Sequence, residues 1–146
     1  MIRFQWKKQI ILFSLLPMLS IAAAPVWQIV PNESKLTFTA TQNDAPVTGE
    51  FKKFSAEIHF DPDHLDTNNV KVVVDTPSIS DPYNQLADTL KSPDWFDVKK
   101  FPQAIFVSNN FKKTGEKTYQ SNGNLTIRDK TLPVTLLFYA RRIYEQ

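Results

Sequence analysis

The chain contains no cysteine, only three glycines and only two histidines. The lack of cysteine excludes disulfide bonds, thiolate catalysis and cysteine-ligated zinc or iron–sulfur sites. The glycines Gly49, Gly115 and Gly123 lie in no G-x-S-x-G nucleophile elbow and in no phosphate-binding glycine loop. The stability of the fold must therefore come from packing, for which the chain supplies eleven Phe, three Trp and four Tyr.

The two histidines support only a weak enzymatic hypothesis. His59 stands between Ile58 and Phe60 in an alternating pattern, which favours a solvent-facing strand position over a place in a catalytic triad. We therefore expect no enzymatic activity and no catalytic residue. A hydrolase that uses His59 or His64 as its base is the enzymatic alternative.

Five side chains within eight residues form the sharpest candidate for a metal site: His59, Asp61, Asp63, His64 and Asp66. Oxygen and imidazole ligands at such close spacing can hold a divalent cation. The cluster lacks the glycine and the distal glutamate of a calcium-binding loop, and Asp-Pro-Asp is ordinary turn chemistry. We therefore favour a structural loop over a metal site, and we expect no metal and no cofactor.

Residues 1–22 have the pattern of an export signal. Three basic residues precede a mainly apolar stretch over residues 10–24, which contains Pro17 and closes with small residues. The stretch has fifteen residues, fewer than the roughly 20 that cross a bilayer, so cleavage is favoured over retention as an N-terminal anchor. We expect a periplasmic protein with one domain over residues 23–146 and no stable membrane span after cleavage.

Removal of the signal changes the charge balance of the chain. The full chain has 17 basic and 15 acidic residues, for a net charge of +2. Arg3, Lys7 and Lys8 leave with the signal and no acidic residue does, so the remaining charge is about −1. A nearly neutral protein offers little attraction to phosphate backbones or anionic lipid headgroups, and we expect no nucleic-acid partner.

Apolar and polar residues alternate along most of the chain after the signal, which predicts β-strands. One short helix is expected from Ser80-Asp81-Pro82 to Leu90, because a capping side chain and a proline begin it and Leu86 and Leu90 share one face. The fold class is therefore all-β, an antiparallel sandwich or barrel with one short helical insert. The expected strands cover residues 26–30, 36–41, 47–60, 70–75, 103–111, 119–127 and 134–139.

Three local features of this pattern lead to further expectations. The alternation slips by one residue at Lys52-Lys53, which predicts a bulge or sharp bend within one long strand. Residues 103–111 are apolar on both faces, which predicts a strand covered on both sides. Residues 128–133 are expected to form the tight connection between the last two strands.

The aromatic residues allow two interpretations. They either fill a solid core or line a barrel that leaves room for one ligand. Burial of about twenty ligand carbons at ~0.8 kcal/mol each offers roughly 16 kcal/mol, enough against an association cost of about 4–15 kcal/mol. An apolar site of this kind leaves no motif, so the residue pattern alone does not decide between a filled and a hollow barrel.

Eight motifs stand between about residues 26 and 138. They are Trp27-Gln28-Ile29-Val30-Pro31, Val47-Thr48-Gly49-Glu50-Phe51, Ile58-His59-Phe60-Asp61-Pro62, Asp75-Thr76 with Ser78-Ile79, Leu90-Lys91-Ser92-Pro93-Asp94-Trp95-Phe96-Asp97, Phe101-Pro102-Gln103-Ala104-Ile105-Phe106, Gly123-Asn124-Leu125-Thr126-Ile127-Arg128 and Pro133-Val134-Thr135-Leu136. In these motifs the chain resembles the YceI-like family, and the stretch around Pro93-Asp94-Trp95-Phe96 is the most specific match.

The resemblance implies a lipocalin-like antiparallel barrel, exported in bacteria, that holds a polyisoprenoid or similar apolar lipid. It implies no catalytic activity. Aromatic and aliphatic residues within or near the matched motifs are then expected to line the ligand site. These residues are Phe38, Phe51, Ile58, Phe60, Val72, Val74, Leu86, Leu90, Trp95, Phe96, Phe106, Leu125 and Ile127.

The chain departs from the family pattern at two places. Asp129 stands where a glycine commonly follows the arginine of the Leu-Thr-Ile-Arg motif, and aspartate tolerates turns. Family members usually continue for several tens of residues past the Pro133-Val134-Thr135-Leu136 segment. We therefore expect a shortened barrel that lacks closing strands. A non-binding barrel or a solid-core interaction module remains the alternative function, and a dimer remains open.

Overall fold

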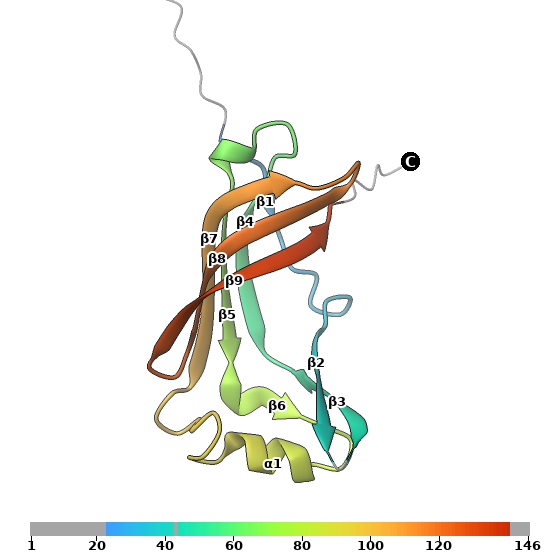
Figure 1. Cartoon of the computed structure of the whole chain (residues 1–146), viewed down its shortest axis with the longest axis vertical. Coiled ribbons are helices and arrows are strands. Elements are labelled where there is room, and N and C mark those ends of the chain that lie inside the picture. Colours follow the sequence, from blue (N-terminus) through green and yellow to red (C-terminus); the bar gives the residue numbers. More distant parts are fainter. Residues whose placement is uncertain (1–22, 43, 141–146) are drawn as a thin grey trace, which may run out of the picture.

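The computed structural model describes residues 23–42 and 44–140, which form nine β-strands, one α-helix and two 3-10 helices. The predicted export signal lies outside the described residues. The all-β prediction with one short helix is confirmed (Figure 1). The elements are β1 (Val26–Trp27), β2 (Leu36–Gln42), β3 (Ala45–Phe51), β4 (Phe54–His59), η1 (Leu65–Thr67), β5 (Asn69–Asp75), η2 (Thr76–Ser78), β6 (Ile79–Ser80), α1 (Gln85–Lys91), β7 (Gln103–Lys113), β8 (Thr118–Ile127) and β9 (Lys130–Tyr139).

Six strands form the larger sheet, in the order β1-β4-β5-β7-β8-β9. All neighbours in it are antiparallel, and Figure 1 shows the sheet curling so that β8 and β9 cross in front of β4 and β5. Within the described residues β1 and β9 pair with different neighbours and not with each other. The larger sheet is therefore curled but does not close into a barrel within the described residues.

The smaller sheet contains β2, β3 and β6, and it lies at the same end of the molecule as α1 (Figure 1). Ile79 of β6 packs with Leu86, Ala87 and Leu90 of α1 in a buried cluster. Leu86 and Leu90 share one face of the helix, as their spacing predicts, and this face covers the end of the sheet. Burial of this face, rather than helix propensity, stabilises so short a helix.

The bend expected at Lys52-Lys53 is confirmed, but the prediction of one long strand is wrong. β3 ends at Phe51 in the smaller sheet, and β4 begins at Phe54 in the larger one. The Lys52 N–H donates to the carbonyl of Ser78 at 3.2 Å, and the Lys53 N–H donates to Ser78 Oγ at 3.1 Å. These bonds to η2 take the backbone groups that a continuous strand would pair within one sheet.

The helix begins later than its sequence pattern predicts. Asn84, with a φ of 59°, precedes the first helical residue, so Pro82 does not occupy the first helical position. Asp81 still caps the helix across this turn. Its carboxylate accepts hydrogen bonds from the N–H of Tyr83 at 2.9 Å and from the N–H of Ala87 at 2.6 Å. The predicted cap position is therefore wrong, since Asn84 is the N-cap residue, although the Asp81 carboxylate still bonds a backbone N–H in the first turn.

Two expectations about the last three strands are wrong. Val107 of β7 is 41% exposed, so the outer face of this strand is not covered. β9 begins at Lys130 and includes Pro133, so the connection from β8 is shorter than predicted. A positive φ of 56° at Arg128 makes the turn tight. Pro133 is tolerated because β9 is an edge strand, where a missing N–H leaves no partner unbonded.

Candidate functional site

The strand register of the larger sheet places a row of apolar side chains on one face, which we call the inner face. Phe106 lies opposite Val72 and Leu125 in this register, and all three share the inner face. Phe106 is 6% exposed, whereas Ile127 at the end of the row is 36% exposed. Six predicted lining residues meet on this face: Ile58, Val72, Val74, Phe106, Leu125 and Ile127.

An aromatic cluster formed by Trp27, Phe60, Phe111, Tyr119 and Phe138 fills one end of the inner face. Phe60 is 3% exposed, and its ring centroid lies 5.1 Å from that of Tyr119 and 5.3 Å from that of Phe138. The Trp27 Nε1–H donates to the carbonyl of Phe60 at 2.9 Å, which fixes β1 against the end of β4. The predicted lining residue Phe60 therefore lies at the centre of this cluster.

The opposite end of the inner face is covered by a second group of apolar residues, which we call the helix cluster. It contains Ile79, Leu86, Ala87 and Leu90, with Phe38, Phe51 and Phe96 packed against them. Phe51 connects the other two rings, at 5.5 Å from Phe38 and 6.1 Å from Phe96. Five predicted lining residues belong here: Phe38, Phe51, Leu86, Leu90 and Phe96.

Trp95 stands apart from the other predicted lining residues. Its side chain is 56% exposed, and it lies in the turns that follow α1 rather than on a sheet face. Its carbonyl accepts a hydrogen bond from an Arg128 guanidinium nitrogen at 2.9 Å. The backbone of Trp95 thus anchors the β8–β9 turn, and nothing in the structure explains the indole side chain at this position.

The inner residues of β9 and most of the aromatic cluster are not among the predicted lining residues. Leu132, Val134 and Leu136 lie opposite Leu125, Gly123 and Ser121 of β8, and so share the inner face. Their period-two spacing was visible in the sequence, but Pro133 was interpreted as part of a connection. The missed aromatic residues are Trp27, Phe111, Tyr119 and Phe138.

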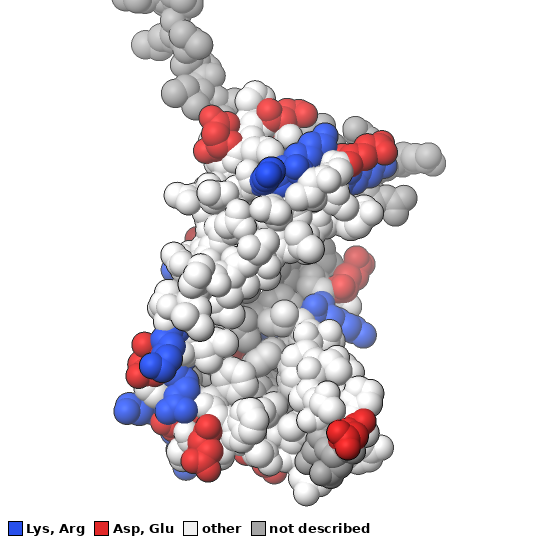
Figure 2. Space-filling view, in the orientation of Figure 1, with Lys and Arg blue, Asp and Glu red and all other residues white. Residues whose placement is uncertain are grey.

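The inner face is exposed where β9 forms its margin. Leu132 is 63% exposed and Leu136 is 42% exposed, although both side chains are on the face that is buried elsewhere. Figure 2 shows no charged side chain over the middle of β8 and β9, and the white surface there includes polar as well as apolar residues. Leu132 and Leu136 therefore give the inner face an exposed apolar margin along β9.

One buried polar group interrupts this apolar face. Ser121 is 2% exposed, and its Oγ has no hydrogen-bond partner within the described residues. It lies opposite Phe111 on one side and Leu136 on the other. Ser108, on the same face, donates instead to the carbonyl of Asn122 at 2.7 Å. The face therefore offers burial and little polar chemistry.

The acidic cluster between β4 and β5 is a hydrogen-bonded loop. Asn68, 2% exposed, accepts from the Asp61 N–H at 2.8 Å and donates to the Asp61 carbonyl at 3.0 Å. The carboxylate of Asp61 accepts from the Asp63 N–H at 2.9 Å and contacts His64 Nδ1 at 3.0 Å. Within residues 23–42 and 44–140, no three His, Asp or Glu side chains are arranged to hold a metal ion.

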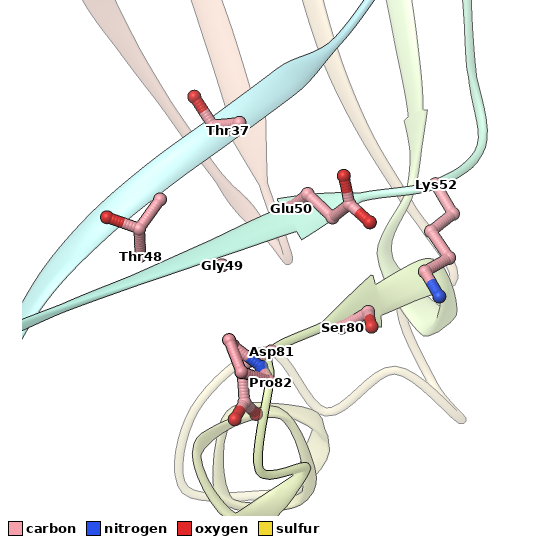
Figure 3. Close-up of a pocket in the computed structure, with 8 residues that line it drawn as sticks. All are labelled: Thr37, Thr48, Gly49, Glu50, Lys52, Ser80, Asp81 and Pro82. Atoms are coloured by element: carbon pink, nitrogen blue, oxygen red, sulfur yellow. The ribbon is translucent and has the colours of Figure 1, made fainter.

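A pocket of about 380 Å³ lies on the outer face of the β2–β3 hairpin (Figure 3). The side chain of Phe38 lies on the other face of this hairpin. Figure 3 shows Lys52 extending toward the strand that carries Ser80. The lining is polar and charged, so this pocket is chemically unlike the inner face. It is lined by Thr37, Thr48, Gly49, Glu50, Lys52, Ser80, Asp81 and Pro82.

Residues 27–143 match a family model described as the YceI-like domain. A UPF0312 protein of Pseudomonas putida is 36% identical over 89 residues, which cover 61% of this chain and 46% of that protein. Protein YceI of Salmonella arizonae is 36% identical over 88 residues, which cover 60% of this chain and 46% of that protein. The chain thus spans about half the length of the curated relatives it matches.

Solved structures with the same fold include Burkholderia cenocepacia BcnA, with a TM-score of 0.72 and 32% identity over 78% of this chain and 72% of that one. The Campylobacter jejuni YCEI protein has a TM-score of 0.59 and 23% identity, covering 76% of this chain and 66% of that one. This lipocalin-like fold is that of binding proteins rather than of known enzymes. None of the helices in the described residues is long and apolar enough to cross a membrane.

Proposed function

The chain belongs to the YceI-like family, and on that premise we propose that it binds a polyisoprenoid or similar apolar lipid along the inner face of its curled sheet. The observation that carries the proposal is the row of apolar side chains on the inner face, which includes Val72, Phe106 and Leu125 and reaches the exposed margin of β9. Leu132 and Leu136, on this surface, remain exposed. A ligand that covered them would gain ~0.8 kcal/mol for each buried CH₂ group.

The chemistry of the inner face favours an unbranched or isoprenoid chain over a compact polar ligand. The inner positions of β5 are Val70, Val72 and Val74, and no charged side chain interrupts them. Apolar contact is non-directional, so affinity grows with chain length until the surface is covered. Polar ligands need convergent donors and acceptors, and the buried hydroxyl of Ser121 supplies only one such group.

Two adjacent leucines provide the test of this proposal. Leu136 is on the inner face, whereas Leu137 is on the outer face and is 75% exposed. We expect Leu136→Asp to weaken binding of a long-chain isoprenoid quinone at least about tenfold, or ~1.4 kcal/mol, because a carboxylate would face the apolar chain. Leu137→Asp is the matched control and should bind as the unchanged protein does. Ligand quenching of tryptophan fluorescence, with quinones of several chain lengths, measures both.

Equal affinity of the two variants, or affinity independent of isoprenoid length, would contradict the proposal. A folded chain that binds no quinone would favour the second candidate, a non-binding interaction module. That candidate is supported by the position of β9 at the margin of the larger sheet within the described residues.

Export to the periplasm is part of the same proposal. The signal pattern of residues 1–22 supports it, and a lipid carrier between two membranes would have a use for an apolar surface. Cell fractionation and mass determination of the N-terminus test it. Cleavage near residue 22 and recovery in the periplasmic fraction are expected, and an uncleaved chain in the cytoplasm would contradict it.

A further inference from the structure

Ser121 has a buried side-chain hydroxyl without a hydrogen-bond partner among residues 23–42 and 44–140. The residue is 2% exposed and lies within β8, where the strand register places it on the inner face. A buried hydroxyl that forms no hydrogen bond destabilises a folded protein, so native structures rarely retain one without a use. The hydroxyl of Ser121 therefore calls for a partner from outside the described residues.

The side chains around Ser121 are apolar. Phe111 of β7 and Leu136 of β9 are directly opposite it in the strand register. Gly123 is the next residue on the same face of β8, and the Phe106 ring fills the space beside it, since a Cβ on Gly123 would lie 2.6 Å from Phe106 Cζ. None of these four residues brings a side-chain donor or acceptor to the hydroxyl.

A buried water molecule would be a poor partner at this position. Such a water typically makes about three hydrogen bonds, so it needs polar groups besides Ser121. The neighbouring inner hydroxyl, that of Ser108, already donates to the Asn122 carbonyl at 2.7 Å and accepts from the Asn110 N–H at 3.1 Å. A ligand that brings one oxygen atom on an apolar chain satisfies Ser121 without further polar groups.

We propose that Ser121 holds the oxygen-bearing end of the bound lipid, which is therefore an isoprenoid chain that ends in a neutral hydroxyl or carbonyl group. This inference rests on the proposed function, because it places the lipid along the same inner face. A serine hydroxyl donates to a carbonyl oxygen, and it both donates to and accepts from an alcohol. A phosphate or carboxylate at this position would lose its hydration without gaining a cation, since Phe111, Leu136 and Gly123 are uncharged.

The position of Ser121 also gives the lipid one orientation. Leu136, which the proposed ligand covers, has its Cβ about 4.5–5.5 Å from that of its cross-strand partner Ser121. From Ser121, β8 runs toward the end of the molecule that carries α1 (Figure 1), and Leu125 continues the inner row in that direction. The oxygen therefore lies beside the aromatic cluster, and the chain extends toward the helix cluster.

Two ligands with the same chain test this inference. They are geranylgeraniol and the hydrocarbon in which a hydrogen replaces its hydroxyl group. Displacement of 1-anilinonaphthalene-8-sulfonate from the purified, delipidated chain measures the affinity of each. We expect the unchanged protein to bind the alcohol about three- to tenfold more tightly than the hydrocarbon, because only the alcohol forms the hydrogen bond.

Ser121→Ala should remove this preference by weakening binding of the alcohol and leaving binding of the hydrocarbon unchanged. Ser55→Ala is the matched control, because Ser55 is an exposed serine on the outer face of β4, and it should keep the preference. In the ligand-free protein, Ser121→Ala should retain or raise the melting temperature, since it removes a buried hydroxyl without a partner.

The outcomes separate this inference from the proposed function. Equal affinity of the unchanged protein for both ligands would overturn the inference and leave lipid binding intact. The same holds if Ser121→Ala keeps the preference for the alcohol, or if it lowers the melting temperature of the ligand-free chain, as loss of a structural hydrogen bond would. A folded, unchanged protein that binds neither ligand would overturn the inference and the proposed function together.

Discussion

Phe60 connects the separate strands at one end of the inner face. It lies just after β4 and contacts aromatic rings from β1, β7, β8 and β9. Its N–H donates to the carbonyl of Pro25 at 3.0 Å, and its own carbonyl accepts from Trp27. Edge-to-face ring pairs contribute roughly 0.5–1.5 kcal/mol each beyond area burial, so this one residue stabilises contacts between strands that are distant in sequence.

His64 provides a residue-scale prediction about pH. Its hydrogen bond to Asp61 raises the pKa of the imidazole above its usual 6.5, and the charge of Asp61 acts in the same direction. Desolvation lowers the pKa, and the charges of Asp63 and Asp66 raise it by less. Because the folded pKa is raised, the stabilisation is present below pH 6.5 and is lost as the pH rises through the folded value. An NMR titration of His64 should therefore give a midpoint above 6.5.

The titration has two matched variants. Asp61→Asn should lower the pKa of His64 toward its usual value, because it removes both the charge and the principal hydrogen-bond acceptor. Asp66→Asn should lower it less, since that carboxylate has the smallest effect. Equal effects of the two substitutions would show that the Asp61 contact does not persist in solution.

At the scale of elements, α1 depends on a carboxylate outside the helix. Asp81 is 7% exposed and accepts the hydrogen bond of the Ala87 N–H. Without an acceptor, that buried N–H would lose its partner, at a cost of about 1–3 kcal/mol. Asp81→Ala should therefore lower the free energy of unfolding by this amount, measured by urea denaturation with circular dichroism.

Asp88→Ala is the control for this prediction. Asp88 lies in the first turn of the same helix, is exposed, and has the same side chain. Its loss should change the free energy of unfolding by less than about 0.5 kcal/mol. If the two substitutions destabilise the protein equally, Asp81 does not act as a cap.

The sequence predicted the strands well where apolar and polar residues alternate. It did not predict which strands pair with each other in the same sheet. Alternation around Phe38 and Phe106 indicated strands that the structure contains. The assignment of β3 and β4 to different sheets depends on distant bonds from Lys53 to Ser78, which no local pattern reveals. Pro133 favours a connection in the sequence pattern, because proline disfavours central strands and is tolerated mainly at a sheet edge.

The candidate site was predictable in its chemistry rather than in its arrangement. Apolar alternation identified Val72 and Phe106 as residues of one face. Trp95 belongs to the most specific motif but is exposed, and its bond to Arg128 is made by its backbone carbonyl. The role of Gly123 is likewise not predictable from the sequence pattern. A Cβ there would lie 2.6 Å from Phe106 Cζ, so the glycine provides space for an inner ring.

At the scale of the whole molecule, the inner face has two different ends and an exposed margin. The aromatic cluster closes one end, the helix cluster covers the other, and Leu132 and Leu136 remain accessible between them. The chain spans about half the length of the curated relatives that it matches.

Native mass spectrometry of the chain purified from the periplasm, without detergent, tests the central proposal most directly. We expect a folded protein that carries an apolar lipid, seen as an added mass that organic extraction removes and that fragmentation identifies as an isoprenoid chain. The unchanged protein and Leu137→Asp should both carry it, whereas Leu136→Asp should carry much less. Repeated preparations of a folded chain without any bound lipid would contradict the account.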